Sequence, residues 1–313
     1  MVKPKTLPLG IDVGRSRIRV AHAEIDEEGR PRLISVAVRK ADGELGATIR
    51  SALEELACAE RRCVFGLDEP AALIRIATFP KMNRSERDRA ARYEAARFID
   101  SPIDEVSVRV APLLMQDGVC AIGIVRRDAI ASVKAAARRA KLRPIAIDSN
   151  SLALRRSIPG SDAIVDIGTQ MTLLHTYGRR IPTTQTFSTG GSKFTAAVAE
   201  SLGIDNTQAE RRKHAHGLAG SGAYALDTLI ESITSAIIEI RASGRAEMRG
   251  ISLVGNGSRL VGFATELERA SAIPTRLATF APDVSRTLPP DVLRASAPDW
   301  ATAFGLALWA TTS

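Results

Sequence analysis

Aromatic residues and cysteines are scarce in this chain, and each scarcity limits the functions and the environment that we expect for it. Aromatic side chains make up only 4% of the sequence and do not alternate with basic residues, so a dedicated nucleic-acid surface is not expected. The three cysteines, Cys58, Cys63 and Cys120, form no C-x-x-C pair. This odd, scattered set predicts reduced core thiols in a reducing compartment.

Long hydrophobic runs are missing as well. The longest apolar stretch near the end, from Trp300 to Ala310, is too short to span a bilayer. The opening Met-Val-Lys-Pro-Lys leads directly into a predicted strand and does not resemble a signal peptide. We therefore expect a soluble, cytoplasmic protein.

Several familiar ligand motifs are also absent. The sequence contains neither G-x-G-x-x-G nor G-x-x-x-x-G-K-[ST], which argues against a dinucleotide-binding fold and a P-loop. The net charge of +8 comes without a helix-turn-helix, zinc-finger or RNA-binding signature. The charge instead fits general solubility or a position beside an anionic membrane surface.

What the chain does contain is enough apolar sequence for a large α/β core. Apolar residues make up 45% of its 313 residues, and that length predicts roughly two domains. Each half presents a three-strand meander followed by a helix and a strand. We expect a first lobe at 1–158, carrying an inserted subdomain at about 72–142, and a second lobe at 159–313, with a cleft between the lobes.

One short pattern occurs twice, at 9–20 and at 163–174. Each copy is an apolar run, then Asp-x-Gly with a hydroxyl residue close behind, then a second apolar run. This arrangement predicts a β-hairpin whose turn directs backbone N–H groups and a carboxylate to one spot. Two such turns facing each other would hold a polyphosphate and its divalent cation from both sides.

The duplication assigns roles to the residues of the two turns. Asp12 and Asp166 are predicted to hold Mg²⁺, largely through its water ligands, as Mg²⁺ prefers beside phosphates. Glycines allow close approach of the backbone and hydroxyls add hydrogen bonds; these residues are Gly14, Ser16, Gly168 and Thr169. Alternatively, each aspartate only stabilises its own turn, but the duplication favours the binding site.

Two further segments could contact the same ligand. Gly190 and Gly191 begin a predicted helix, whose N-terminus suits phosphate, although a plain tight turn explains them equally well. Glu210 and Lys213 lie three residues apart on one helix face and could bind a ribose. Thr207-x-x-Glu210 is also a capping-box pattern, and the residues alone favour that cap.

Gly255, Asn256, Gly257 and Ser258 follow a buried strand and begin another helix. In α/β folds, the backbone approaches a ligand at the carboxyl end of such a strand. His214-x-His216 is interpreted as a pair at a helix end rather than a metal site.

Taken in order, these elements resemble the actin-like ATPase superfamily. Leu9–Val20 is similar to its first phosphate loop, Ala163–Leu174 to its second, and Leu253–Phe263 to its adenosine motif. Ala209-Glu210-x-x-Lys213 is similar to the helix that binds the nucleoside. A finer resemblance, covering almost the whole chain, is to the PilM family of type IV pilus assembly, a relative of FtsA. It rests on Ile74–Met82, Glu86–Ile99, Ile147-Asp148 with Leu152–Leu154, and Ala303–Leu308.

The resemblance implies a two-lobed actin-like α/β fold with an inserted subdomain, and ATP with Mg²⁺ in the cleft, with Arg15 among the residues of the first loop. It implies partners too: the cytoplasmic N-terminal peptide of a PilN-like inner-membrane protein and other components of the pilus alignment complex. The chain would then lie at the cytoplasmic face of the inner membrane and bind no nucleic acid. ATP hydrolysis would be slow at most, and no residue is identified as catalytic. Self-association, a sugar kinase of the same superfamily, and a degenerate scaffold without nucleotide stay open.

Overall fold

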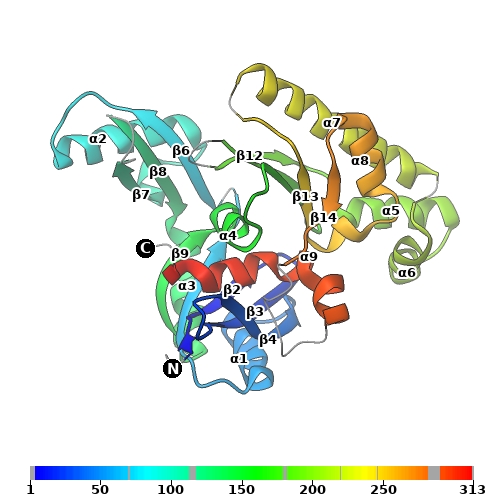
Figure 1. Cartoon of the computed structure of the whole chain (residues 1–313), viewed down its shortest axis with the longest axis horizontal. Coiled ribbons are helices and arrows are strands. Elements are labelled where there is room, and N and C mark those ends of the chain that lie inside the picture. Colours follow the sequence, from blue (N-terminus) through cyan, green and yellow to red (C-terminus); the bar gives the residue numbers. More distant parts are fainter. Residues whose placement is uncertain are drawn as a thin grey trace.

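The computed structural model describes residues 4–69, 71–112, 118–178, 182–218, 220–244, 246–280 and 290–311, which form three β-sheets and the helices around them (Figure 1). The first sheet contains β1 (Lys5–Thr6), β2 (Leu9–Val13), β3 (Arg17–Ile25), β4 (Pro31–Lys40), β5 (Arg62–Leu67) and β9 (Arg143–Ser149). Its order is β1-β3-β2-β5-β9, with β4 pairing β3. β2 is antiparallel to β3 and parallel to β5, so β2 and β5 end at the same edge of the sheet.

Helices cover both faces of this sheet. α1 (Leu45–Leu56) and α3 (Arg127–Arg139) pack on one face, whereas α9 (Pro290–Ala307) crosses the other. Successive residues of a strand face opposite layers, so Leu9 and Ile11 point into the core with α1 and α3. A Cβ on the intervening Gly10 would lie 1.9 Å from the carbonyl oxygen of Ala303. The missing side chain therefore lets α9 lie directly on the backbone of β2.

A three-stranded layer is inserted after β5. It consists of β6 (Ala72–Thr78), α2 (Arg84–Ala95), β7 (Val106–Pro112) and β8 (Val119–Arg126), with the short 3₁₀ helices η1 (Ala96–Phe98) and η2 (Ile103–Glu105). The layer has its own core. The sequence predicts an insert at about 72–142, but the apolar face of α3 packs against α1 in the core of the first sheet. We therefore propose that the separate layer ends at Arg126.

The second sheet repeats the plan of the first. Its strands are β10 (Ala163–Ile167), β11 (Thr172–Tyr177), β12 (Pro182–Phe187), β13 (Ile251–Val254) and β14 (Thr275–Leu277), in the order β12-β11-β10-β13-β14. Around it lie α5 (Gly191–Leu202), α6 (Asn206–His216), α7 (Ser221–Ala242), α8 (Phe263–Ser271) and the 3₁₀ helix η3 (Asn256–Arg259). The apolar stripe of α7 packs on this sheet together with Phe194 and Phe263.

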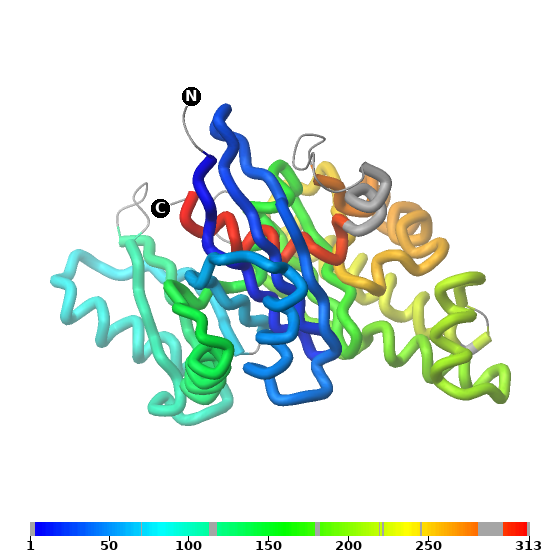
Figure 2. The backbone as a smooth tube through the Cα atoms, turned by 90° about the horizontal axis from the view of Figure 1, so that it is seen from below, coloured from blue at the N-terminus to red at the C-terminus, as the bar shows by residue number. Residues whose placement is uncertain are grey.

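The helix α4 (Asn150–Ser157) connects the two sheets, and α9 later packs across it. A Cβ on Gly305 of α9 would lie 1.9 Å from the carbonyl oxygen of Ala153 in α4, so these helices touch backbone to backbone. Figure 2 shows the later part of α9 and η4 (Leu308–Thr311), in red, beside the first strands, in blue. The expected second lobe at 159–313 includes α9, but α9 buries Phe304 against the first sheet. We propose a first lobe of residues up to 158 together with α9.

Candidate functional site

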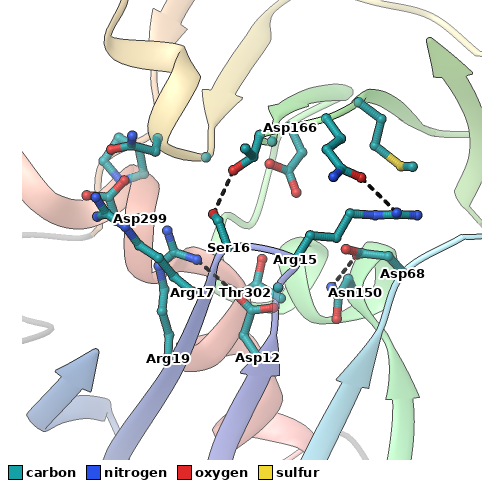
Figure 3. A pocket seen from close by; sticks show the side chains of 18 residues that line it. Asp12, Arg15, Ser16, Arg17, Arg19, Asp68, Asn150, Asp166, Asp299 and Thr302 are labelled. Carbon is teal, nitrogen blue, oxygen red and sulfur yellow. Dashed lines mark hydrogen bonds and ion pairs between the residues drawn. The ribbon is translucent and has the colours of Figure 1, made fainter. Parts of the chain in front are cut away.

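The turns of the two Asp-x-Gly hairpins touch each other across the space between the sheets. The hydroxyl oxygens of Ser16 and Thr169 lie 2.6 Å apart, and Arg15 donates a hydrogen bond of 2.9 Å to the Gln170 side chain. Figure 3 shows Arg15 and Ser16 among the side chains that line a small pocket here. Two turns that are far apart in sequence therefore form one local structure, as the duplicated pattern predicts.

Behind the touching turns lies a small cavity of about 90 Å³. Residues from both hairpins, from the η3 turn and from α9 line it; those predicted from the sequence are Asp12, Gly14, Arg15, Ser16, Asp166, Gly168, Thr169, Gly255 and Asn256. A larger cleft of about 1070 Å³ adjoins it and extends along α5 and α6. It is lined by Gly191, Glu210, Lys213 and Gly257, so the two spaces together contact most of the predicted residues.

Two predicted residues face neither space. Ser258 is 2% exposed and donates its hydroxyl to the carbonyl of Gly255 within the η3 turn. Gly190 packs against the second hairpin turn, where a Cβ would lie 2.7 Å from the carbonyl oxygen of Gly168. In this conformation both residues shape the loops and do not line the cavity or the cleft.

The N-terminus of α5 is not open to a phosphate in this conformation. The Gly191 N–H donates to the carbonyl of Gly168, and the Ser192 N–H donates to that of Thr169. These donors are the ones that a helix N-terminus would offer to an anion, and here they hold the second hairpin turn. Gly190 and Gly191 therefore form a tight turn that leads into a helix, which is the alternative that the sequence leaves open.

The hairpin turns themselves do present donors. Four backbone N–H groups donate no hydrogen bond to any residue that the structure describes: those of Arg15, Ser16, Thr169 and Gln170. Successive N–H groups in such turns form concave sites for anions. The two turns therefore offer hydrogen-bond donors to a phosphate from opposite sides.

The aspartates of the two hairpins, Asp12 buried and Asp166 half-buried, lie close enough to repel each other. Burial raises the pKa of Asp12, and the guanidinium of Arg19, 3.5 Å away, offsets part of that effect. Burial, and then the charge of Asp12, raise the pKa of Asp166 to about 6. Raised pKa values mean that the carboxylates lack enough positive charge around them, which is the environment that a divalent cation would neutralise.

Sequence reasoning missed a third carboxylate. Asp68 follows β5, lines the same cavity and accepts a hydrogen bond from the Asn150 side chain. Its pKa is raised to about 8 by burial first and then by the charges of Asp12 and Asp166. No three histidine, cysteine or acidic side chains within the described ranges cluster tightly enough to hold a metal directly. A cation here would therefore keep water molecules as ligands.

A glycine turn closes the second side of the cavity. Gly255 has φ +80°, and a Cβ there would lie 2.5 Å from the Asp166 Oδ1 atom. At Gly257 a Cβ would lie 2.4 Å from the Ile167 side chain. Any larger residue at these positions would push the η3 turn away from Asp166, so the two glycines allow this close approach.

Glu210 belongs to a hydrogen-bond network and does not cap its helix. Asp205 is the N-cap residue of α6, so the Thr207-x-x-Glu210 capping box is wrong. The Glu210 carboxylate accepts from Lys213 at 2.6 Å and from His214 at 2.9 Å, and it also bonds Thr195. Burial alone would raise the Glu210 pKa, but hydrogen bonds from Lys213 and Thr195 outweigh it and lower the pKa.

Lys213 is buried, with 4% exposure, and its ammonium is fully used. Besides Glu210 it donates to the Thr195 hydroxyl at 2.8 Å and to the Gly191 carbonyl at 3.1 Å. An ammonium has three donors, so Lys213 joins α6 to the start of α5. Glu210, which is partly exposed, is the member of the pair that faces the cleft.

α9 connects the site to the first lobe. The carbonyl of Pro298 accepts from the Gly255 N–H at 3.0 Å, and Asp299 forms an ion pair of 3.0 Å with Arg259. Pro298, Asp299 and Thr302 also line the cavity. The last helix therefore forms one wall of a site whose other walls come from both sheets.

Two repeated β-meanders around a shared cleft, with an inserted layer in the first half, define an actin-like ATPase fold. Among solved structures, the ethanolamine utilization protein EutJ from Carboxydothermus hydrogenoformans shows the same fold at TM-score 0.58 and 16% identity, covering 99% of this chain and 90% of that chain. Component A of the (R)-2-hydroxyglutaryl-CoA dehydratase from Acidaminococcus fermentans matches at TM-score 0.51 and 11% identity, with 96% of each chain covered.

The family match is more specific. The family model described as type IV pilus assembly protein PilM matches residues 10–311, and the chain belongs to that family. A structure described as the PilM-PilN type IV pilus biogenesis complex is similar at TM-score 0.84 and 26% identity, covering 96% of this chain and 97% of that chain. No curated protein sequence matches the chain significantly. None of the described helices is both long and apolar enough to cross a membrane.

Proposed function

We propose that this chain is an ATP-binding assembly protein of a type IV pilus or related secretion machine, with the nucleotide held between the two hairpins. The observation that carries the nucleotide proposal is the meeting of the two Asp-x-Gly turns around Asp12 and Asp166. The triphosphate would lie between the turns and accept hydrogen bonds from the backbone N–H groups of Arg15, Ser16, Thr169 and Gln170. The nucleoside would occupy the cleft beside Glu210.

The residues of the cavity fit a cation bound through water. Asp12 and Asp166 would accept hydrogen bonds from the water ligands of Mg²⁺, as expected for this ion beside phosphates. When bound, Mg²⁺ would neutralise charge on the phosphate oxygens and relieve the repulsion between the carboxylates. Gly255 supports this fit, because its missing side chain leaves the Asp166 Oδ1 atom accessible.

We also propose a PilN-like inner-membrane protein as the partner. The support is the family match over residues 10–311 and the similarity to a structure of a PilM-PilN complex over almost the full length of both chains. The cytoplasmic N-terminal peptide of such a partner would bring this chain to the cytoplasmic face of the inner membrane. The family match disfavours the sugar-kinase alternative.

Isothermal titration with MgATP tests the nucleotide site. Wild type should bind and Asp12→Ala should not, while Asp162→Ala, which removes an aspartate far from the cavity at the start of β10, should bind as wild type does. Absence of binding in every form would identify a scaffold that has lost its nucleotide. Titration with a synthetic cytoplasmic peptide of the PilN-like protein from the same organism tests the partner, and absence of binding would contradict that assignment.

A further inference from the structure

The two sheets follow the same plan, and in each one a strand parallel to the first strand of the hairpin adds to the wall of the cavity. These strands are β5 and β13. In the second sheet, Asp166 pairs with Val254 of the parallel strand β13, and the chain then turns through Gly255. In the first sheet, Asp12 pairs with Gly66 of the parallel strand β5. Asp68 follows two residues later, beyond the end of β5. The two carboxyl strand ends face each other, one with a glycine turn and one with a carboxylate.

From this geometry we propose that Asp68 is a third carboxylate of the cation site and accepts a hydrogen bond from a water ligand of the nucleotide-bound Mg²⁺. The inference rests on the proposed function, because it places Asp68 in the same nucleotide site. Asp68 lines the cavity together with Asp12 and Asp166 (Figure 3). It comes from a different strand end than either of them, so the three carboxylates approach the cavity from three sides.

The contacts of Asp68 leave it one oxygen for a ligand. Its Oδ1 atom accepts from the Asn150 amide, which holds the carboxylate in place. Its Oδ2 atom accepts no hydrogen bond from any residue within the described ranges. Asn150 is 3% exposed and lines the same cavity. A buried amide therefore orients the Asp68 carboxylate.

The charges around the cavity support a role with a cation. Arg19 pairs with Asp12, and Arg259 pairs with Asp299, whereas neither Asp68 nor Asp166 has an ion-pair partner in the described part of the chain. Like charges without such partners repel each other and would also repel a bare triphosphate. A carboxylate in this place should weaken the binding of ATP alone and strengthen the binding of ATP with a divalent cation.

This difference gives a test in which the two effects have opposite signs. ATP binding is measured by titration at about pH 8.5, above the pKa of Asp68, with Mg²⁺ present and with Mg²⁺ removed by a chelator. Asp68→Asn should weaken MgATP binding about tenfold, since it removes a hydrogen-bond acceptor that is charged. The same variant should strengthen binding of metal-free ATP relative to wild type.

The neighbouring Glu69→Gln provides the matched control. Glu69 forms an ion pair with Arg75 at 3.3 Å and lines neither the cavity nor the cleft, so both affinities should stay at wild-type values. Asp68→Ala, checked for folding by thermal unfolding, should behave as Asp68→Asn does. Electron paramagnetic resonance of Mn²⁺ bound with ATP should show a changed signal in both Asp68 variants.

The possible outcomes are distinct. Equal loss of MgATP and metal-free ATP binding in Asp68→Asn would overturn the inference and indicate a structural role. Unchanged binding in both conditions would overturn it as well. If wild type itself binds no nucleotide, the proposed function fails first, and the inference fails with it.

Discussion

The hydroxyl groups of Ser16 and Thr169 lie 2.6 Å apart and close the space between the two hairpin turns. A triphosphate between the turns would have to separate these hydroxyls, because it would occupy the same space. With Cys58 replaced by serine, since it is the free thiol that is not fully buried, the pair Ser16→Cys and Thr169→Cys should crosslink readily under mild oxidation. MgATP should slow the crosslinking, measured by mobility on non-reducing gels. Equal rates with and without nucleotide would contradict binding between the turns.

Gly255→Ala should weaken MgATP binding by about tenfold or more, because a 2.5 Å contact with Asp166 forces the η3 turn outward. Gly262→Ala is the control. Gly262 has a similar φ of +85° but open space around its Cα atom, so this substitution should cost only the backbone strain of about 1 kcal/mol. Isothermal titration and thermal unfolding separate the two effects. Similar nucleotide affinity in both variants would show that the turn does not need to approach Asp166.

Gly10→Ala should destabilise the protein by about 3 kcal/mol or more, or prevent folding, because the new Cβ would lie 1.9 Å from the carbonyl oxygen of Ala303. Gly123→Ala is a matched control in another strand. There the nearest atom, the Arg109 carbonyl oxygen, is 3.9 Å away, and stability should change little. Urea unfolding measures both variants. A mild effect at Gly10 would mean that α9 does not pack directly on β2.

Glu210→Gln should reduce the preference for ATP over its 2′- or 3′-deoxy forms, because its carboxylate faces the cleft and is the predicted ribose acceptor. His214→Ala should show a weaker form of the same change, since His214 donates to the other Glu210 oxygen at 2.9 Å. Arg212→Ala, an exposed position on the same helix, should leave the preference unchanged. Competition binding with the three nucleotides provides the measurement. An unaltered preference in Glu210→Gln would place the ribose elsewhere.

Stability without nucleotide should fall as the pH rises from about 6.5 to 8. Burial and then repulsion from Asp12 and Asp166 raise the Asp68 pKa to about 8 from 3.8, so in this window the folded chain holds a proton that the unfolded chain has released. When the folded state binds more protons, the free energy of unfolding decreases with increasing pH. His175, whose pKa burial lowers to about 4 from 6.5, has the opposite effect below this window.

Thermal unfolding at several pH values measures this dependence. The melting temperature should decrease by a few degrees between about pH 6.5 and pH 8, and the slope should flatten in Asp68→Asn. An identical slope in the variant would show that another group titrates.

Much of this architecture could be predicted because the relevant signals are local. The Asp-x-Gly turns, the apolar strands and the stripe of α7 are periodic or motif patterns within short windows. The wrong capping box at Glu210 shows the limit of such patterns. Asp205, two residues before Thr207, offers the same helix a better-placed oxygen. Only the tertiary contact with Thr195 shows where the Glu210 side chain goes.

Asp68 and the position of α9 could not be predicted in the same way. No motif marks Asp68, and its role depends on β5 lying parallel to β2, so that both strands end beside the same cavity. Comparing the two halves strand by strand could have found it, since it follows β5 as Gly255 follows β13. The packing of α9 on the first sheet depends on Gly10, and its packing on α4 depends on Gly305. Both look like ordinary glycines until the partner backbone is known.

The packing of α9 also bears on how the chain is made. Leu7, Ala21 and Leu33 are synthesised long before Phe304 and Leu308, which pack against them. We therefore expect this apolar face to stay uncovered during translation until α9 has left the ribosome. Chains truncated before α9 should be retained by chaperones.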